Sequence, residues 1–261
     1  MEIIGYAASI IIGLSLGLIG GGGSILTLPI LVYLFKVEPE IATSYSLFIV
    51  GITSLVGAFK NYKNGNIQFK PSLYFSIPSV ILVLVVRKIL LPKIPDYLFN
   101  IGSMEVTKNL LLMMVFAILM VFASASMIKK RHVAAVNVNI HPVQLLGIGA
   151  AVGMVTGFLG AGGGFLIIPA LIYFAGLSMK QAIGTSLVII AINSLIGFGS
   201  DMVTGFTVNY TLLLSVSALA IVGMFIGTVL SKKIKDEKLK PIFGWFVLVM
   251  GLYIIVKELI H

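Results

Sequence analysis

The sequence predicts an all-α fold: a polytopic integral membrane protein with two homologous repeats of four to five helical segments each. Three observations lead to this prediction. The chain is too apolar for a surface that faces water, its apolar residues fall into long runs, and its two halves match each other at one fixed offset. In each half a glycine stretch precedes a short apolar run, which indicates a short helix entered through a glycine break.

The composition indicates that lipid surrounds the chain. Hydrophobic residues make up 59% of the 261 residues and charged residues 10%, whereas a soluble domain has ~25% charged residues. A helix that is apolar all round has to be buried in protein or in lipid, and a 27.9 kDa chain has no interior large enough for so many. No enzyme activity, cofactor or metal site is expected, because no ionisable side chain lies at the centre of a long apolar run and cysteine is absent.

Apolar segments follow one another along the whole chain. A helix that spans the bilayer needs ~20 residues, and eight of the ten segments reach about that length. Two segments, 24–36 and 164–176, are shorter. Each could be re-entrant, could span half of the membrane, or could cross it if the glycine run before it supplies the missing length. The sequence leaves these alternatives open. The ten predicted segments are 3–19, 24–36, 40–60, 71–91, 108–128, 142–160, 164–176, 179–201, 209–231 and 241–259.

An offset of 140 residues aligns the two halves. The stretch GLIGGGG at 17–23, followed by Pro29, matches GFLGAGG at 157–163, followed by Pro169. The same gap-free register continues over some fifty residues, which indicates an internal duplication. Five crossings per half give inverted repeats and four give parallel ones, and the sequence does not decide between them. The predicted units are a first transmembrane repeat at 1–128, a linker at 129–141 and a second transmembrane repeat at 142–261.

The positive charge of the chain favours a membrane orientation over nucleic-acid binding. The chain has 18 Lys+Arg against 9 Asp+Glu, and the cationic residues lie in short loops between apolar runs. If all ten segments cross, six of the 18 share a side with the two termini, including those of a predicted loop at 87–108. Both topologies place the loop at 231–240 in the cytoplasm, so the sequence predicts a multi-pass protein of the cytoplasmic membrane with both termini extracytoplasmic.

The glycine stretches are the first candidate site. Irregular backbone at membrane depth is tolerated only where it lines a cavity or is buried in protein. The first N–H groups of the helix after each break lack partners within the helix and carry the positive end of its dipole, which suits an anion. A tight turn between close-packed helices is the alternative interpretation. The candidate substrate-binding residues of the breaks are Gly20, Gly21, Gly22, Gly23 and Ser24, with Gly160, Ala161, Gly162, Gly163 and Gly164.

Neutral polar residues on the next helix are the second candidate site. Ser46 and Thr53 lie near one line of that helix, and Ser186 and Asn193 repeat the pattern. Hydroxyl and amide groups donate to an anion without burying a charge, although hydrogen bonds between helices explain the same pattern. A different set of small residues, spaced by four and three, predicts close helix packing: Gly13, Gly17 and Gly20, with Gly153, Gly157 and Gly160.

The doubled motif resembles a known family. The segments GLIGGGGSILTLPIL and GFLGAGGGFLIIPAL, followed by ATSYSL and AIGTSLV, are similar to the TauE/SafE sulfite exporter family, also called the toluene-sulfonate uptake permease family. Both halves carry the motif, so the resemblance covers nearly the whole chain, with Ser24 standing where the second copy has Gly164. Members of the family are membrane permeases associated with sulfite, sulfonates and related organic anions, and the resemblance implies that substrate class.

Together these observations predict a secondary carrier that exports a small sulfur-containing anion such as sulfite or an organosulfonate. A passive anion channel and a carrier for a different small organic anion are the alternatives. The expected partners are the anionic substrate and the lipid bilayer, without nucleic acid. A coupling ion, H⁺ or Na⁺, and assembly as a homodimer are left open, since no carboxylate lies at the centre of an apolar run.

Overall fold

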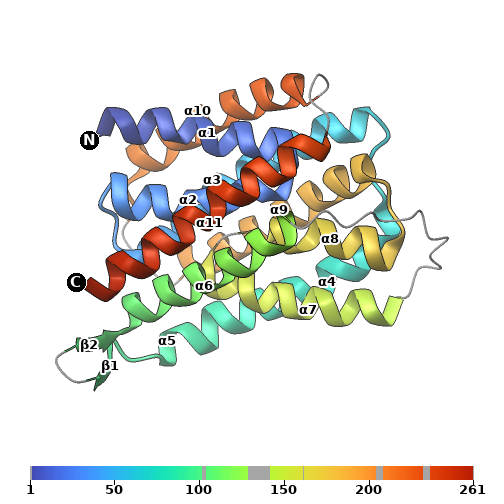
Figure 1. The fold of residues 1–261 in the computed structure, drawn as a ribbon. Helices are drawn as coiled ribbons and strands as arrows, with labels where there is room; N and C mark the ends of the chain where they lie inside the picture. The colour runs from blue at the N-terminus through green and yellow to red at the C-terminus, as the bar shows by residue number, and fades with distance from the viewer. Residues whose placement is uncertain are drawn as a thin grey trace.

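The computed structural model describes residues 2–101, 104–128, 142–160, 162–203, 208–231 and 236–260. The predicted fold class is confirmed, because helices running back and forth between two ends form one bundle, with both chain termini at the same end (Figure 1). Among the described residues, six helices are long and apolar enough to cross a membrane, fewer than the eight expected. Further apolar helices are shorter, among them Ile3–Ile19 at the start of the chain.

The first half begins with α1 (Glu2–Ile19), after which a glycine break leads into a short apolar segment. This short segment consists of the 3-10 helix η1 (Gly21–Leu26), α2 (Thr27–Pro29) and the π-helix η2 (Ile30–Leu34). The rest of the half consists of α3 (Pro39–Lys63), α4 (Phe69–Val85), η3 (Val86–Leu90), α5 (Leu91–Lys93), the strands β1 (Tyr97–Ile101) and β2 (Met104–Thr107), and α6 (Lys108–Ile128). The strands pair as an antiparallel hairpin, which the sequence did not predict.

The second half contains α7 (Pro142–Leu159), α8 (Gly164–Ala175), α9 (Met179–Met202), α10 (Tyr210–Leu230) and α11 (Asp236–Ile260). Local chemistry sets several of these boundaries. Ser178 and Gln181 form a capping box at the start of α9, and the side chain of Asn209 accepts from the backbone of Leu212 to cap α10. Gly176, with a φ of 63°, ends α8 in the left-handed region that glycine adopts without strain. The predicted linker at 129–141 lies outside the described residues.

The outward surface of the bundle is apolar. Phe122 on α6 is 71% exposed, and Val249 on α11 and Leu214 on α10 are also largely exposed. Contiguous exposed side chains of this kind are costly in water and cost nothing against lipid tails. This surface therefore supports lipid as the medium around the bundle.

The short segment between Gly21 and Leu34 returns along α1 to the end where the chain begins. The ring of Phe35 lies against that of Tyr6, with 5.2 Å between their centroids. Tyr33 Oη donates to Glu258 Oε1 at 2.8 Å, which brings the last turn of α11 to the same end. This short segment therefore reverses the direction of the chain and runs back to the end where α1 begins.

Glycines place helices of the two halves in close contact, as their spacing predicted. A Cβ atom at Gly13 of α1 would collide with the backbone of Ala220 on α10, and one at Gly153 of α7 would collide with the backbone of Ser79 on α4. The partners at Gly17 and Gly157 lie further along α10 and α4, so each pair runs parallel. Gly20 and Gly160 are exceptions to this role, because they belong to the breaks described below.

Helices α3 and α9 cross at the centre of the bundle and run antiparallel. Gly51 of α3 lies against Ser194 and Leu195 of α9, while Leu47 lies against Gly197. Each half thus contributes five segments that alternate in direction, and α7 runs opposite to α1 (Figure 1). The halves therefore run in opposite directions, which favours the inverted over the parallel arrangement. The duplication itself stays a prediction, which this arrangement supports.

Candidate functional site

The two glycine breaks close the preceding helices in the same way. Gly20 N–H donates to Leu16 O at 2.8 Å and Gly160 N–H donates to Thr156 O at 2.9 Å. Both glycines have positive φ values, 76° and 67°, which side chains with a Cβ rarely adopt. The 140-residue offset therefore relates the helix ends as well as the sequence motifs.

Beyond this point the breaks differ. The first break continues at once into the 3-10 helix η1, so a helix starts at Gly21 and not near Ser24 as expected. Gly23 lies tightly against the backbone of Leu16 and the hydroxyl of Ser15 on α1, and Ser24 is fully buried. The first break is thus packed closely against the helix that it follows.

The second break turns before its helix starts. Gly162 and Gly163 both have a φ of 65°, and α8 then begins at Gly164 as predicted. A Cβ at Gly162 would lie 3.4 Å from Ser194 Oγ, and one at Gly163 would collide with Thr156 Oγ1. Ala161 lies outside the described residues. The start of α8 therefore has two hydroxyl groups beside its glycines.

Both hydroxyls are fully buried and lack a hydrogen-bond partner within the described part of the chain. These atoms are Thr156 Oγ1 and Ser194 Oγ. A buried hydroxyl without a partner costs free energy unless something else satisfies it. Neither residue was among the candidates from sequence, although Ser54 and Ser194 match at the 140-residue offset and Ser54 Oγ is also buried without a partner.

The predicted polar line on α3 and α9 is buried, and most of its members bond to protein. Thr53 Oγ1 donates to Ile49 O at 2.6 Å, and Ser186 Oγ donates to Ile183 O at 2.9 Å. Asn193 Nδ2 donates to Ser79 Oγ on α4 at 2.6 Å, a bond between helices. Ser46 Oγ and Asn193 Oδ1 have no partner in the described residues. Contact of these side chains with a substrate stays a prediction.

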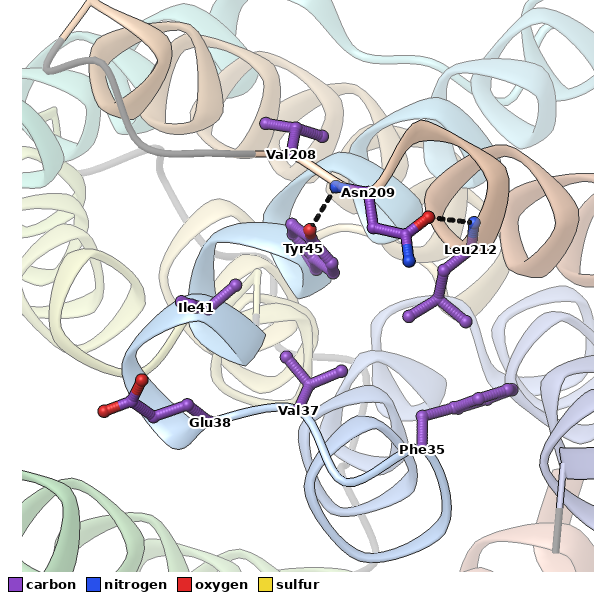
Figure 2. A pocket seen from close by; sticks show the side chains of 8 residues that line it. All are labelled: Phe35, Val37, Glu38, Ile41, Tyr45, Val208, Asn209 and Leu212. Carbon is purple, nitrogen blue, oxygen red and sulfur yellow. Dashed lines mark hydrogen bonds between the residues drawn. The ribbon is translucent and has the colours of Figure 1, made fainter.

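A pocket of about 480 Å³ is lined by none of the residues of the breaks. It sits between the start of α3 and the start of α10, where the backbone N–H of Asn209 donates to Tyr45 Oη at 2.6 Å (Figure 2). Phe35, Val37, Glu38, Ile41, Tyr45, Val208, Asn209 and Leu212 line it. Side chains pack against Gly20 and Gly162 of the breaks, and the pocket lies at the end that carries the termini, where Phe35 contacts Tyr6.

Three polar side chains meet in the interior near that end. Arg87 Nη1 donates to Asp201 Oδ2 at 2.6 Å and to Ser44 Oγ at 3.0 Å, and the Ser44 hydroxyl donates to the same carboxylate oxygen at 2.5 Å. Arg87 is 5% exposed and Asp201 is 8% exposed. Nearby, Lys108 Nζ lies 2.6 Å from Glu40 Oε1.

The sequence analysis counted Arg87 both in the predicted segment 71–91 and in a loop at 87–108, and the loop assignment was wrong. Residues 69–93 form one uninterrupted helical stretch, so Arg87 lies inside a helix. A signal was present, because Arg87 and Asp201 carry opposite charges near segment ends on the same predicted side. Pairing allows both charges to be buried where either alone would be unstable.

The bundle has an apolar exterior, and its two halves run in opposite directions. Each half contains a glycine break that is followed by a short helical segment. These features define a polytopic membrane transporter. The family model described as "Sulfite exporter TauE/SafE" matches residues 6–254, and the chain belongs to that family. A "Probable membrane transporter protein" of Xylella fastidiosa is 28% identical over 94% of this chain and 91% of its own length. "Probable membrane transporter protein YunE" of Bacillus subtilis is 27% identical over 96% and 97%. "Probable membrane transporter protein MJ0441" of Methanocaldococcus jannaschii is 25% identical over 94% of each chain.

Proposed function

We propose that the protein is a secondary carrier that exports a small sulfur-containing anion, such as sulfite or an organosulfonate, across the cytoplasmic membrane. The observation that carries this proposal is the second break, where the buried hydroxyls of Thr156 and Ser194 have no partner in the described structure. An oxyanion accepts from hydroxyl and backbone N–H donors at once, and the dipole at the start of α8 favours its charge. No positive side chain is needed at the break itself.

The substrate class comes from the family. Its description names sulfite export, whereas the relatives are named only as probable membrane transporters. Sulfite is small enough to lie beside glycines, whose lack of a Cβ lets an oxygen approach the backbone. Sulfite is therefore the first anion to test, and sulfonates with small substituents are the next.

Packing supports a carrier over a channel. A channel needs a continuous path for its ion, whereas the glycine breaks are covered by side chains such as Ile183 and Val50. A carrier exposes its site to one side at a time as one half moves against the other. The inverted halves and the ion pair that joins them, Arg87 with Asp201, fit a carrier in a closed state.

The distribution of cationic residues supports the orientation. If all ten segments cross, the sequence assigns six of the 18 Lys and Arg residues to the side of the termini and twelve to the other side. The end with more positive charge faces the cytoplasm in most membrane proteins. On this proposal both termini lie outside the cell and the predicted linker at 129–141 lies inside.

The test is counterflow of labelled sulfite in proteoliposomes. If the protein is a carrier, proteoliposomes loaded with unlabelled sulfite take up labelled sulfite from outside. The rate of this exchange saturates as the sulfite concentration rises. Gly162→Leu is expected to abolish this exchange, because Gly162 lies against Val50, Ile190 and Ser194 and has a positive φ. Gly147→Leu on α7 is the matched control, since nothing lies within 4 Å of a Cβ at that position.

The outcomes separate the alternatives. Flux of sulfite that neither saturates nor shows counterflow would identify a passive channel. Counterflow retained in full by a correctly inserted Gly162→Leu protein would remove the second break from the substrate path. Absence of sulfite exchange, with exchange of another small organic anion, would keep the carrier and change its substrate.

A further inference from the structure

We infer that Arg87 forms a second oxyanion-binding site, at the end of the bundle that carries the termini, in which an incoming anion competes with Asp201 for the guanidinium group. This inference rests on the proposed anion transport, since it assigns the site a place on the substrate path. It concerns the part of Arg87 that the ion pair leaves unused.

The ion pair occupies one nitrogen of Arg87. Nη1 donates to Asp201 Oδ2 and to Ser44 Oγ. Nε and Nη2 are buried and have no hydrogen-bond partner among the described residues. Since Nε carries one N–H and Nη2 carries two, three donors of a cationic group remain unsatisfied inside the protein.

Unsatisfied donors of this kind indicate a ligand. A buried donor without an acceptor is costly, and the cost is larger for a charged group. The unused Nε–Nη2 edge is the fork with which arginine binds two oxygens of one carboxylate, phosphate or sulfonate group. The chemical class that fits is therefore a small oxyanion with at least two oxygens on one centre.

The neighbours of Ser44 on α3 place Arg87 near both features of the candidate site. Ser44, which bonds to Arg87, follows Thr43, whose backbone carbonyl contacts Gly160 of the second break. On the other side of Ser44 in sequence, Tyr45 lines the pocket that opens at this end (Figure 2). Arg87 thus lies in the region between the pocket and the break.

Charge balance makes the anion and Asp201 competitors. The cluster holds Arg87 and Asp201, with Lys108 and Glu40 as a second pair, so it is neutral as it stands. A bound monoanion adds a negative charge close to the Asp201 carboxylate, and like charges at short range repel strongly inside a protein. Anion binding therefore weakens the bond between Arg87 on η3 and Asp201 on α9, which links the two halves of the chain.

The experiment titrates the full-length protein in detergent with sodium methanesulfonate and follows its thermal stability. Dimethyl sulfone is the uncharged control of similar shape. We expect saturable stabilisation by methanesulfonate alone. Arg87→Lys keeps the charge and loses the fork, so its dissociation constant should rise about tenfold or more. Lys88→Gln removes the neighbouring, exposed cation and should leave the constant unchanged.

Asp201→Asn gives the outcome that a purely structural ion pair would not produce. It retains Arg87 and removes the competing charge, so methanesulfonate should bind several-fold more tightly. If Arg87→Lys does not give a folded protein, the Asp201→Asn result decides alone. An affinity unchanged in both variants, an equal loss in Lys88→Gln, or no stabilisation of the unsubstituted protein would overturn the site.

Failure of this site and failure of the proposed function are distinguishable. If Arg87→Lys binds methanesulfonate as the unsubstituted protein does and still exchanges sulfite, the carrier stands and the second site falls. If the protein binds methanesulfonate through Arg87 but exchanges no anion in proteoliposomes, the site stands and the transport proposal falls.

Discussion

Asn193 of α9 donates its amide N–H to the hydroxyl of Ser79 on α4 across 2.6 Å, and both side chains are fully buried. The bond joins the second half of the chain to the first. Ser79 is also the residue whose backbone Gly153 of α7 contacts, so α4, α7 and α9 meet at this point. Hydrogen bonding between helices, which the sequence left open as one interpretation of Asn193, is therefore present.

A double-mutant cycle with Asn193→Ala and Ser79→Ala should measure this bond. We expect each single variant to lower the free energy of unfolding and the pair to show a coupling energy of about 0.6 kcal/mol, the average for such bonds in membrane proteins. Reversible denaturation in mixed detergent micelles provides the measurement. Strictly additive losses would show that the two side chains contribute independently.

Ser194→Ala should separate transport from stability. Its hydroxyl has no partner in the described structure, so its removal leaves no protein group unpaired and the thermal midpoint should stay the same or rise. Sulfite exchange should fall about tenfold, as expected for loss of one hydrogen bond to a charged ligand.

Ser217→Ala is the control for Ser194→Ala. Its hydroxyl donates to Leu213 O at 2.7 Å within α10, far in sequence from the breaks. Exchange by Ser217→Ala should match that of the unsubstituted protein. Unchanged exchange by Ser194→Ala would show that Ser194 does not bind the anion.

Gly153→Ala should destabilise the bundle. A Cβ at this position meets the backbone carbonyl of Ser79, which cannot move aside as a flexible side chain could. Overpacking of this kind costs about 1–3 kcal/mol. Thermal unfolding in detergent should show a lower midpoint for Gly153→Ala than for the unsubstituted protein. The midpoint of Gly147→Ala should be unchanged, because nothing lies within 4 Å of a Cβ at that position. Equal midpoints would mean that α4 and α7 separate easily.

Single cysteines can report the orientation, because the chain has no cysteine of its own. Four exposed lysines are suitable positions. Lys36 and Lys93 lie at the end that carries the termini, and Lys63 and Lys180 lie at the other end. Each is replaced singly, as Lys36→Cys, Lys93→Cys, Lys63→Cys or Lys180→Cys. A membrane-impermeant maleimide added to intact cells should label the first two. The other two should react only after the membrane is opened. The reverse pattern would place the termini in the cytoplasm.

Lipid as the solvent made most of the fold predictable from sequence. An apolar run has to begin and end where the bilayer does, and the segment expected at 108–128 is the helix α6 with the same bounds. The hairpin β1–β2 was missed because it lies outside the apolar runs, where this constraint does not act. The inverted arrangement needed the contact of Phe35 with Tyr6, since length alone left the crossing of the short segment undecided.

The candidate site was predictable only in part. The breaks follow from glycine chemistry and a repeated motif, and the start of α8 at Gly164 agrees with that prediction. Thr156 enters the site only because the chain turns back at Gly163. Arg87 and Asp201 are 114 residues apart and each resembles an ordinary charge at a helix end, so their meeting depends on tertiary packing.

The salt bridge of Arg87 with Asp201 makes the two ends of the bundle different, because it joins the two halves of the chain at one end. At the positions 140 residues away in sequence stand Gly227 and Asn61, which cannot form the same pair. Moving the two halves apart at the end beside the termini has to separate these opposite charges, and the corresponding positions in the other half carry no such pair. In the carrier proposed above, this difference would favour the state that is closed at the end beside the termini.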